Sequence, residues 1–157
     1  MYFYWGCSNI APIYGVELDP NTMTPISEKQ ELIFGNETIL GYERPGNNGI
    51  VDREASVLYQ SMKQFYDPKT GKLNLPPQMA SIPGLSAESL TAMFNAIGKP
   101  YIEGAFMTKH GDTYYLQYAC PGTQYNTYAD GVYTSRSPLG PFVRHCLLYT
   151  SPSPRDA

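Results

Sequence analysis

Apolar and aromatic residues alternate with polar residues in two separate parts of the chain. In the first part, the segments with this strand pattern are residues 2–8, 13–18 and 31–34. In the second part, they are residues 102–109, 113–120 and 130–135. Turn-forming residues separate the segments, with Asp19-Pro20 in the first part and His110-Gly111-Asp112 in the second. Because such runs bounded by Gly, Pro, Asn and Asp indicate short strands joined by turns, the pattern predicts antiparallel sheets over residues 2–34 and 101–136.

The two predicted sheets also resemble each other in sequence. Residues 2–7 (YFYWGC) echo residues 115–120 (YLQYAC), and residues 14–17 (YGVE) echo residues 130–133 (DGVY). Repeated small antiparallel sheets, none of which can bury both faces alone, are typical of β-propellers. The repetition predicts an all-β fold in which each sheet is one propeller blade.

The residues between the two sheets have helical periodicity instead. One helix is predicted from an Asp52 N-cap to about Tyr66, ended by Asp67-Pro68, and another from a Ser86 N-cap to Gly98. Their apolar stripes comprise Ala55, Leu58, Met62 and Phe65 in the first and Leu90, Met93, Phe94 and Ile97 in the second. At this spacing we interpret the stripes as packing faces. Residues 52–98 are therefore expected to be a helical insertion between blades.

Composition agrees with this prediction and excludes several classes of protein. The 157 residues suffice for one domain, and 14 Tyr, 14 Gly and 14 Pro favour short strands and turns over a helical bundle. The net charge of −3 comes without a basic stripe, which argues against a nucleic-acid partner. No apolar run approaches the roughly 20 residues that a membrane-spanning helix needs. We therefore expect neither a nucleic-acid nor a membrane partner.

Cysteine and histidine are too sparse for a recognisable metal or triad motif. Cys7 and Cys120 each end a strand pattern and are predicted to be small buried residues rather than disulfide or metal partners. The two histidines, His110 and His145, belong to no HExxH motif, and no CxxC motif or glycine-rich phosphate loop occurs. The sequence thus predicts no metal site and no cofactor.

Both ends of the chain suggest a piece of a longer gene. The strand pattern begins at Tyr2 without signal-peptide features, so we expect a start inside a longer reading frame, with a short natural N-terminus as the alternative. Residues 146–156 (CLLYTSPSPRD) resemble one reading frame of a transposase-type sequencing adapter. Residues 146–157 are therefore expected to be a non-native tail without a blade strand, the alternative being a Ser/Pro-rich flexible tail.

Several blocks resemble glycoside hydrolase family 43. Residues 101–110 (YIEGAFMTKH) resemble the segment that carries the family's catalytic acid. The blocks that follow in the family's order are residues 114–123, 128–133 and 137–142, and residues 4–9 and 12–18 look like the family's first blade. The resemblance covers most of residues 1–50 and 99–142 and leaves out residues 52–98.

This resemblance implies a five-bladed β-propeller, of which residues 1–145 would form a partial domain of about two blades. It implies hydrolysis of arabinosides, xylosides or related plant-type glycosides with inversion, without a cofactor. The family uses three carboxylates: an Asp base, an Asp that tunes the acid, and a Glu acid. In inverting enzymes the acid and base lie about 6.5–9.5 Å apart to admit a water.

Glu103 matches the family's general acid. Its neighbours along the chain are apolar or aromatic, namely Tyr101, Ile102, Ala105 and Phe106. If they also surround it in space, the apolar environment favours the protonated carboxyl that a general acid needs. The alternative is an ordinary glutamate at a strand start with its carboxyl in solvent.

The other two carboxylates have no match in this chain. The family places the base in an Asp segment just before the strand that corresponds to residues 2–7. Asp52 and Asp67 fit the tuning Asp only by their order along the chain, and each suits an ordinary cap or turn equally well. Glu43 could lie near the cleft, but beside Arg44 it also suits a solvated ion pair. We assign none of these residues.

Two aromatic residues are candidates for substrate binding, since a sugar face packs on an aromatic ring. Trp5 suits this role or the core of a blade, and Tyr125 lies in a loop, where binding residues concentrate. The sequence therefore predicts a fragment of a glycosidase that acts on an oligosaccharide or polysaccharide, from a secreted or periplasmic parent. The alternatives are a non-catalytic carbohydrate-binding propeller and a propeller scaffold for protein contacts.

Overall fold

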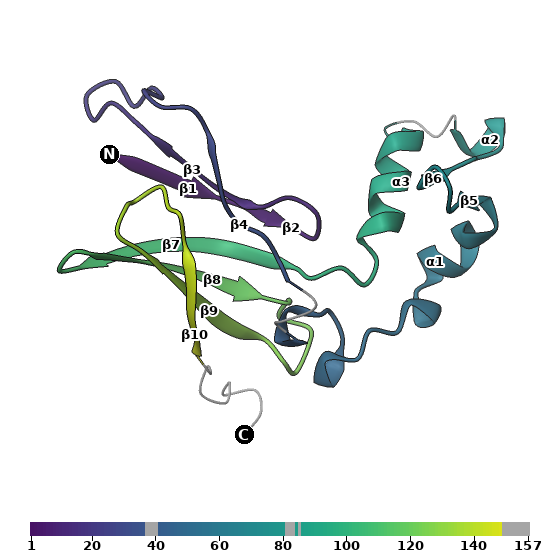
Figure 1. Ribbon diagram of the computed structural model, residues 1–157. Helices are drawn as coiled ribbons and strands as arrows, with labels where there is room; N and C mark the ends of the chain where they lie inside the picture. The colour runs from purple at the N-terminus through teal and green to yellow at the C-terminus, as the bar shows by residue number, and fades with distance from the viewer. Residues whose placement is uncertain (37–40, 81–83, 85, 149–157) are drawn as a thin grey trace. The chain divides into compact units, whose positions relative to one another are not determined.

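The computed structural model describes residues 1–36, 41–80, 84 and 86–148. It divides into two compact units (Figure 1). The sheet unit comprises Met1–Ile50 with Pro100–Ala157, and the helical unit comprises Val51–Lys99. The fold is all-β with a helical insertion.

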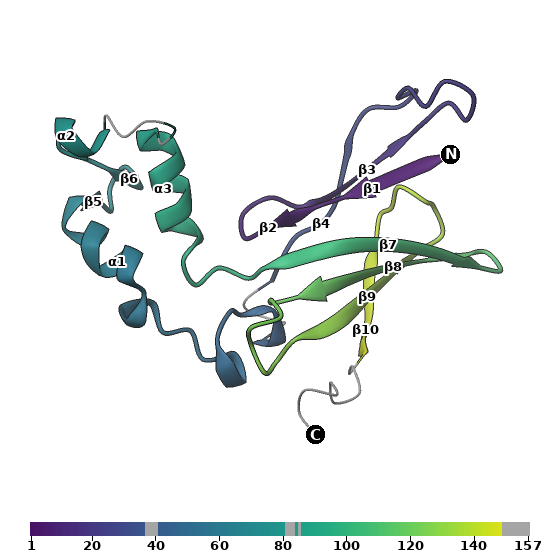
Figure 2. The same cartoon turned by 180° about the vertical axis from the view of Figure 1, so that it is seen from behind.

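The sheet unit contains two antiparallel sheets (Figure 1 and Figure 2). The smaller has the order β1-β3-β4, with β1 at Tyr2–Trp5, β3 at Ile13–Glu17 and β4 at Gln30–Ile33. The larger has the order β10-β9-β8-β7-β2, with β2 at Cys7–Ser8, β7 at Ile102–His110, β8 at Thr113–Cys120, β9 at Ala129–Ser135 and β10 at Val143–Leu148. The antiparallel strands predicted in both parts of the chain are thus confirmed.

The first predicted strand is divided between the two sheets at Gly6. β1 pairs with β3, whereas β2 pairs with β7. A Cβ added at Gly6 would lie 2.8 Å from the Ile13 Cα, so the backbone passes too close to β3 for any side chain. The prediction of one continuous strand over residues 2–8 is therefore wrong, because its second half leaves for another sheet. This transfer brings Cys7 beside β7.

One apolar core joins the two sheets. Its fully or nearly buried members are Ile13 and Ile33 from the smaller sheet and Ile102, Leu116, Tyr118 and Cys120 from the larger. Each large apolar side chain contributes about 1.5–3 kcal/mol when it leaves water. The shared core therefore stabilises both sheets. It includes Ile102, the residue next to Glu103 on β7.

A buried carboxyl holds the segment after β4 against the larger sheet. That segment contains two short 3-10 helices, η1 at Gly41–Glu43 and η2 at Asn47–Gly49. Glu43 is completely buried. Its Oε1 accepts a hydrogen bond from the Tyr118 hydroxyl and its Oε2 one from the Asn36 N–H. The interpretation of Glu43 as a solvated partner of Arg44 is therefore wrong.

The Tyr118 ring leaves no room for a side chain on the next strand. Tyr118 lies opposite Gly131 of β9, and a Cβ added at Gly131 would overlap the Tyr118 ring.

Desolvation raises the pKa of Glu43 from its ordinary value of 4.5, against the hydrogen bonds from Tyr118 and Asn36, which lower it. The pKa of Tyr118 is also raised, first by desolvation and then by the Glu43 charge.

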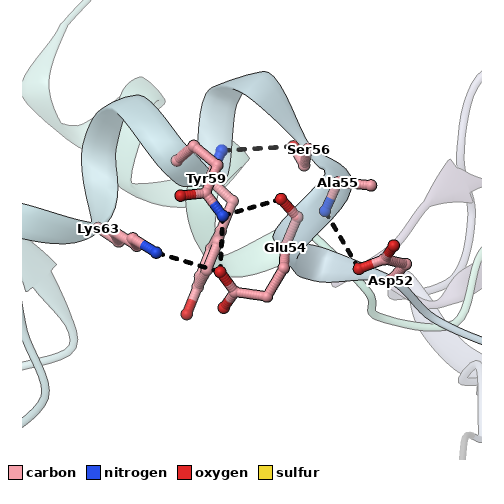
Figure 3. Close-up of polar contacts among 7 residues, drawn as sticks. Asp52, Glu54, Ala55, Ser56, Tyr59 and Lys63 are labelled. Atoms are coloured by element: carbon pink, nitrogen blue, oxygen red, sulfur yellow. Dashed lines mark hydrogen bonds and ion pairs between the residues drawn. The ribbon is translucent and has the colours of Figure 1, made fainter.

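The first predicted helix of the helical unit consists of three pieces. These are η3 at Arg53–Ala55, α1 at Val57–Met62 and η4 at Lys63–Phe65. The Asp52 Oδ1 accepts the Ala55 N–H at 3.1 Å, and the Ser56 Oγ accepts the Tyr59 N–H at 3.3 Å (Figure 3). Two N-caps close together start two separate helices, since each cap residue is itself non-helical. Asp52 is thus a cap, as the sequence suggested, but of a single 3-10 turn.

The rest of the helical unit contains a small hairpin and two further helices. The hairpin pairs β5 (Tyr66–Asp67) with β6 (Lys72–Leu73), and the helices are α2 (Pro77–Ala80) and α3 (Ala87–Ala96). The hairpin was not predicted from the sequence. Helices were expected only within residues 52–98, which holds for the α-helices of the described residues but not for the 3-10 turns η1 and η2.

The predicted apolar stripes are only partly correct. Met62, Leu73, Leu90 and Phe94 form the buried core of this unit, with Leu58, Phe65 and Ile97 packed against it. Ala55 and Met93 are exposed. Ala55 leaves the stripe because the helix is interrupted at Ser56, and the stripe on α3 is narrower than its apolar residues suggest.

The expected tail differs from the prediction at its beginning. β10 continues through Leu148, where Cys146, Leu147 and Leu148 are in register with Val132, Gly131 and Asp130 of β9. The expectation that no strand would form beyond Cys146 is wrong for these residues, because β9 offers them an open edge. Residues 149–157 lie outside the described residues.

The helices of the described residues are too short or too polar to span a membrane.

The cap of α3 provides a first test of the fold. The Ser86 Oγ accepts the Ser89 N–H at 3.0 Å, so Ser86→Ala should lower the free energy of unfolding of the helical unit by about 1 kcal/mol. Ser86→Asp keeps an acceptor at the cap and should retain most of the stability. Urea unfolding followed by circular dichroism measures both variants, and equal losses in the two would contradict the cap.

The buried Glu43 carboxyl makes stability depend on pH. Because burial raises the pKa of Glu43 above 4.5 in the folded chain, the folded state binds its proton more tightly than the unfolded state does. The stabilisation linked to this proton is complete below pH 4.5 and is lost as the pH rises through the folded value. The free energy of unfolding of wild type minus that of Glu43→Gln should therefore fall as the pH rises.

Chemical unfolding over a pH series measures this difference. The titratable groups that interact with Glu43 are Tyr118, Tyr133, Cys120 and Arg144, and they are unchanged in the variant. Glu28→Gln, at an exposed position, controls for the loss of one carboxyl. A difference that grows with pH would show that the folded chain prefers an ionised Glu43.

Candidate active site

Glu103 lies on a β-bulge at the beginning of β7. It pairs with Ala119 of β8, while Phe106 pairs with Gln117, so β7 has one residue more than β8 between these two pairs. Gly104 within the bulge has φ +67°, a left-handed conformation that favours glycine. The glycine of the Glu-Gly pair is therefore explained by the backbone conformation that the bulge requires. A bulge redirects a side chain and is common beside active sites.

The Glu103 carboxyl contacts a phenol and a thiol. The Tyr101 hydroxyl donates to Glu103 Oε2 at 2.9 Å, and Cys7 Sγ lies 3.7 Å from the same oxygen. Cys7 Sγ and the Tyr101 hydroxyl are 2.7 Å apart. Cys7 is in register with Glu103 across the β2–β7 pair. The side chains of Cys7 on β2, Glu103 on β7 and Tyr101 just before β7 thus form a polar cluster.

This environment differs from the apolar one expected for Glu103. Ile102 is 1% exposed in the core, whereas Phe106 is 60% exposed, so the apolar neighbours along the chain do not enclose the carboxyl. Cys7 is exposed, which makes the prediction of a buried residue wrong, while Cys120 is buried as predicted. The reason is that β2 is a two-residue strand at the sheet edge, where one side has no neighbouring strand.

A row of residues across the larger sheet places a second carboxylate on the Glu103 face. Glu103 pairs with Ala119, and Ala119 pairs with Asp130 of β9. Residues directly opposite each other in a sheet share a face, so Asp130 and Glu103 lie on the same face. Tyr128 is close to both, since desolvation and then the charges of Glu103 and Asp130 raise its pKa. Asp130 and Tyr101 were not predicted from the sequence as residues of this site. The two-residue spacing between Tyr101 and Glu103 is a signal that could have indicated Tyr101.

The two aromatic candidates lie in different surroundings. Trp5 is on β1 and stacks between Phe3 and Tyr14, each at 5.4 Å between ring centroids. Tyr125 is in the loop between β8 and β9, where its N–H donates to the Gly122 carbonyl at 3.1 Å. Trp5 is therefore part of an aromatic stack on the smaller sheet. The use of either ring as a sugar platform stays a prediction.

The aspartates considered for the tuning role have local structural roles. Asp52 caps η3 (Figure 3). The Asp67 Oδ1 accepts the Lys69 N–H at 2.9 Å, and this bond, followed by the one from the Thr70 hydroxyl, lowers the pKa of Asp67.

Within the described part of the chain, no group of three or more His, Cys, Asp and Glu could hold a metal ion.

One family model matches the part of the chain that contains Glu103. The model described as glycosyl hydrolases family 43 matches residues 52–152. This range contains Glu103 and also residues 52–98, which the sequence resemblance had left out. It does not extend to residues 1–51, where the first-blade blocks lie. No curated protein and no solved structure matches the chain at a significant level.

The matched range covers more than half of the chain and includes the bulged strand β7, its neighbour β8, and the next strands of the sheet, β9 and β10. The Glu-Gly bulge thus occurs within the family region and not at its margin. On this match, the chain belongs to glycosyl hydrolases family 43.

Proposed function

We propose that this chain supplies the general acid, Glu103, of an inverting glycoside hydrolase that acts on arabinosides, xylosides or related plant-type glycosides. Family membership indicates glycosidase activity in general. The observation that supports the specific proposal is the position of Glu103 in the Glu-Gly bulge of β7, where it is half-buried and accepts the Tyr101 hydroxyl. A carboxyl so held is oriented before substrate arrives.

The proposed chemistry transfers one proton from Glu103. As the bond between the anomeric carbon and the glycosidic oxygen breaks, its electron pair goes to the leaving oxygen and the Glu103 O–H gives its proton to that oxygen. A water attacks the anomeric carbon from the opposite face, and a carboxylate base takes the water's proton. Glu103 ends ionised and regains a proton from solvent.

The base must lie about 6.5–9.5 Å from Glu103 to leave space for this water. In the family arrangement the base comes from an Asp segment just before the strand that corresponds to β1. No residue of this chain is matched to that segment. We therefore expect no turnover from the 157-residue chain alone, and the test uses the longest natural gene product that contains it.

Substitution of Glu103 tests the proposal. With an aryl arabinofuranoside or xyloside that has a poor leaving group, Glu103→Gln and Glu103→Ala should lower kcat by about 10²–10⁴-fold, the usual value of general acid catalysis. An activated leaving group needs less protonation and should suffer less. Initial rates over a series of leaving groups measure both effects.

Asp112→Asn, in the turn between β7 and β8, is the matched control and should leave the rates unchanged. An undiminished rate of Glu103→Ala with a poor leaving group would show that another residue is the acid. Binding of oligosaccharide without any turnover in the longest gene product would favour the non-catalytic carbohydrate-binding propeller. Turnover by the 157-residue chain alone would place the base within it.

A further inference from the structure

Tyr101 and Glu103 are two residues apart in an extended segment. Side chains at this spacing point to the same face of a strand, and the Tyr101 hydroxyl donates to Glu103 Oε2 at 2.9 Å. The intervening Ile102 is 1% exposed on the other face. Tyr101 directly precedes β7, so the contact joins the phenol of the residue before the strand to the carboxyl of the second strand residue.

The backbone of Tyr101 is fixed from a second direction. Its N–H donates to the Glu43 carbonyl at 3.1 Å, and Glu43 is itself held by Tyr118 and Asn36. The Tyr101 side chain has only two torsions to restrict. Its hydroxyl therefore has a defined position relative to the sheet, which is the condition for orienting another group.

The Tyr101 hydroxyl stays protonated near neutral pH and can therefore donate a hydrogen bond there. Its contact with Cys7, then desolvation and the bond to Glu103, raise the pKa of Tyr101 well above its ordinary value of 10. The Cys7 thiol, 3.7 Å from Glu103 Oε2, is a weaker donor to the same oxygen. Both contacts are made to Oε2.

We propose that Tyr101 is a positioning residue that holds Glu103 Oε2 through its hydroxyl, so that the proton for the leaving group resides on Oε1. The proposal rests on the proposed function of Glu103 as the acid. Without the phenol, the carboxyl can rotate and the proton is directed less often at the glycosidic oxygen. The cost falls on the bond-breaking step and not on substrate binding.

A double-mutant cycle tests this proposal in the longest natural gene product. Tyr101→Phe should lower kcat about 10-fold for a phenyl glycoside, the upper end of the usual contribution of one hydrogen bond, with KM changed by less than about twofold. A dinitrophenyl glycoside should be nearly unaffected. In the Glu103→Ala background, Tyr101→Phe should cause no further loss, because Tyr101 acts only through Glu103.

The controls separate positioning from a general structural effect. Tyr114→Phe removes a hydroxyl from β8 beside Lys109 and Ser135 and should leave the rates unchanged. Thermal unfolding of Tyr101→Phe, Tyr114→Phe and wild type shows whether the fold is retained. A structural loss would lower the rates for both leaving groups equally, which would overturn the proposal.

The outcomes also separate this proposal from the proposed function. If Glu103→Ala is impaired but Tyr101→Phe has no effect, or its loss adds fully to that of Glu103→Ala, then Glu103 is the acid and Tyr101 does not position it. If Glu103→Ala is unimpaired, the assignment of the acid fails and the role of Tyr101 fails with it.

Discussion

A fully buried carboxyl, Glu43, determines how the segment after β4 meets the larger sheet. An isolated charge in an apolar core is very unfavourable, so such a group must be hydrogen-bonded or neutral. Tyr118 and Asn36 satisfy its two oxygens, and desolvation raises its pKa. The Glu43 carbonyl in turn accepts the N–H of Tyr101. The position of the candidate acid thus depends on a polar interaction in the core.

Glycines then set the paths of the strands around this interaction. Gly131 leaves room for the Tyr118 ring, and Gly6 lets the chain pass from the smaller sheet to the larger. Gly104 forms the bulge that redirects Glu103. In each case the backbone comes close to another group or adopts a conformation that a side chain would disfavour. Their combined result is that Cys7, Tyr101 and Glu103 lie together.

The polar surroundings of Glu103 bear on the acid role proposed for it. An enclosed apolar pocket would favour the protonated form through desolvation alone. Here a phenol and a thiol contact one carboxyl oxygen, which is the basis of the orienting role proposed for Tyr101. Asp130, two strands away on the same face, adds a second carboxylate that can accept hydrogen bonds from a sugar.

Local features of the sequence determined most strands of the two sheets, though not β10 or the β5–β6 hairpin. They also determined the α3 helix with its Ser86 cap, the helical insertion and the Glu-Gly motif of the family. These follow from the period of alternation, capping and turn chemistry, which act over a few residues. Only the tertiary structure decided that residues 2–8 divide between two sheets, that Glu43 is buried, that Cys7 is exposed and that Tyr101 contacts Glu103. Each of these depends on which distant segments become neighbours. Strand pairing and burial are properties of that arrangement, and a pattern along the chain does not specify the partner.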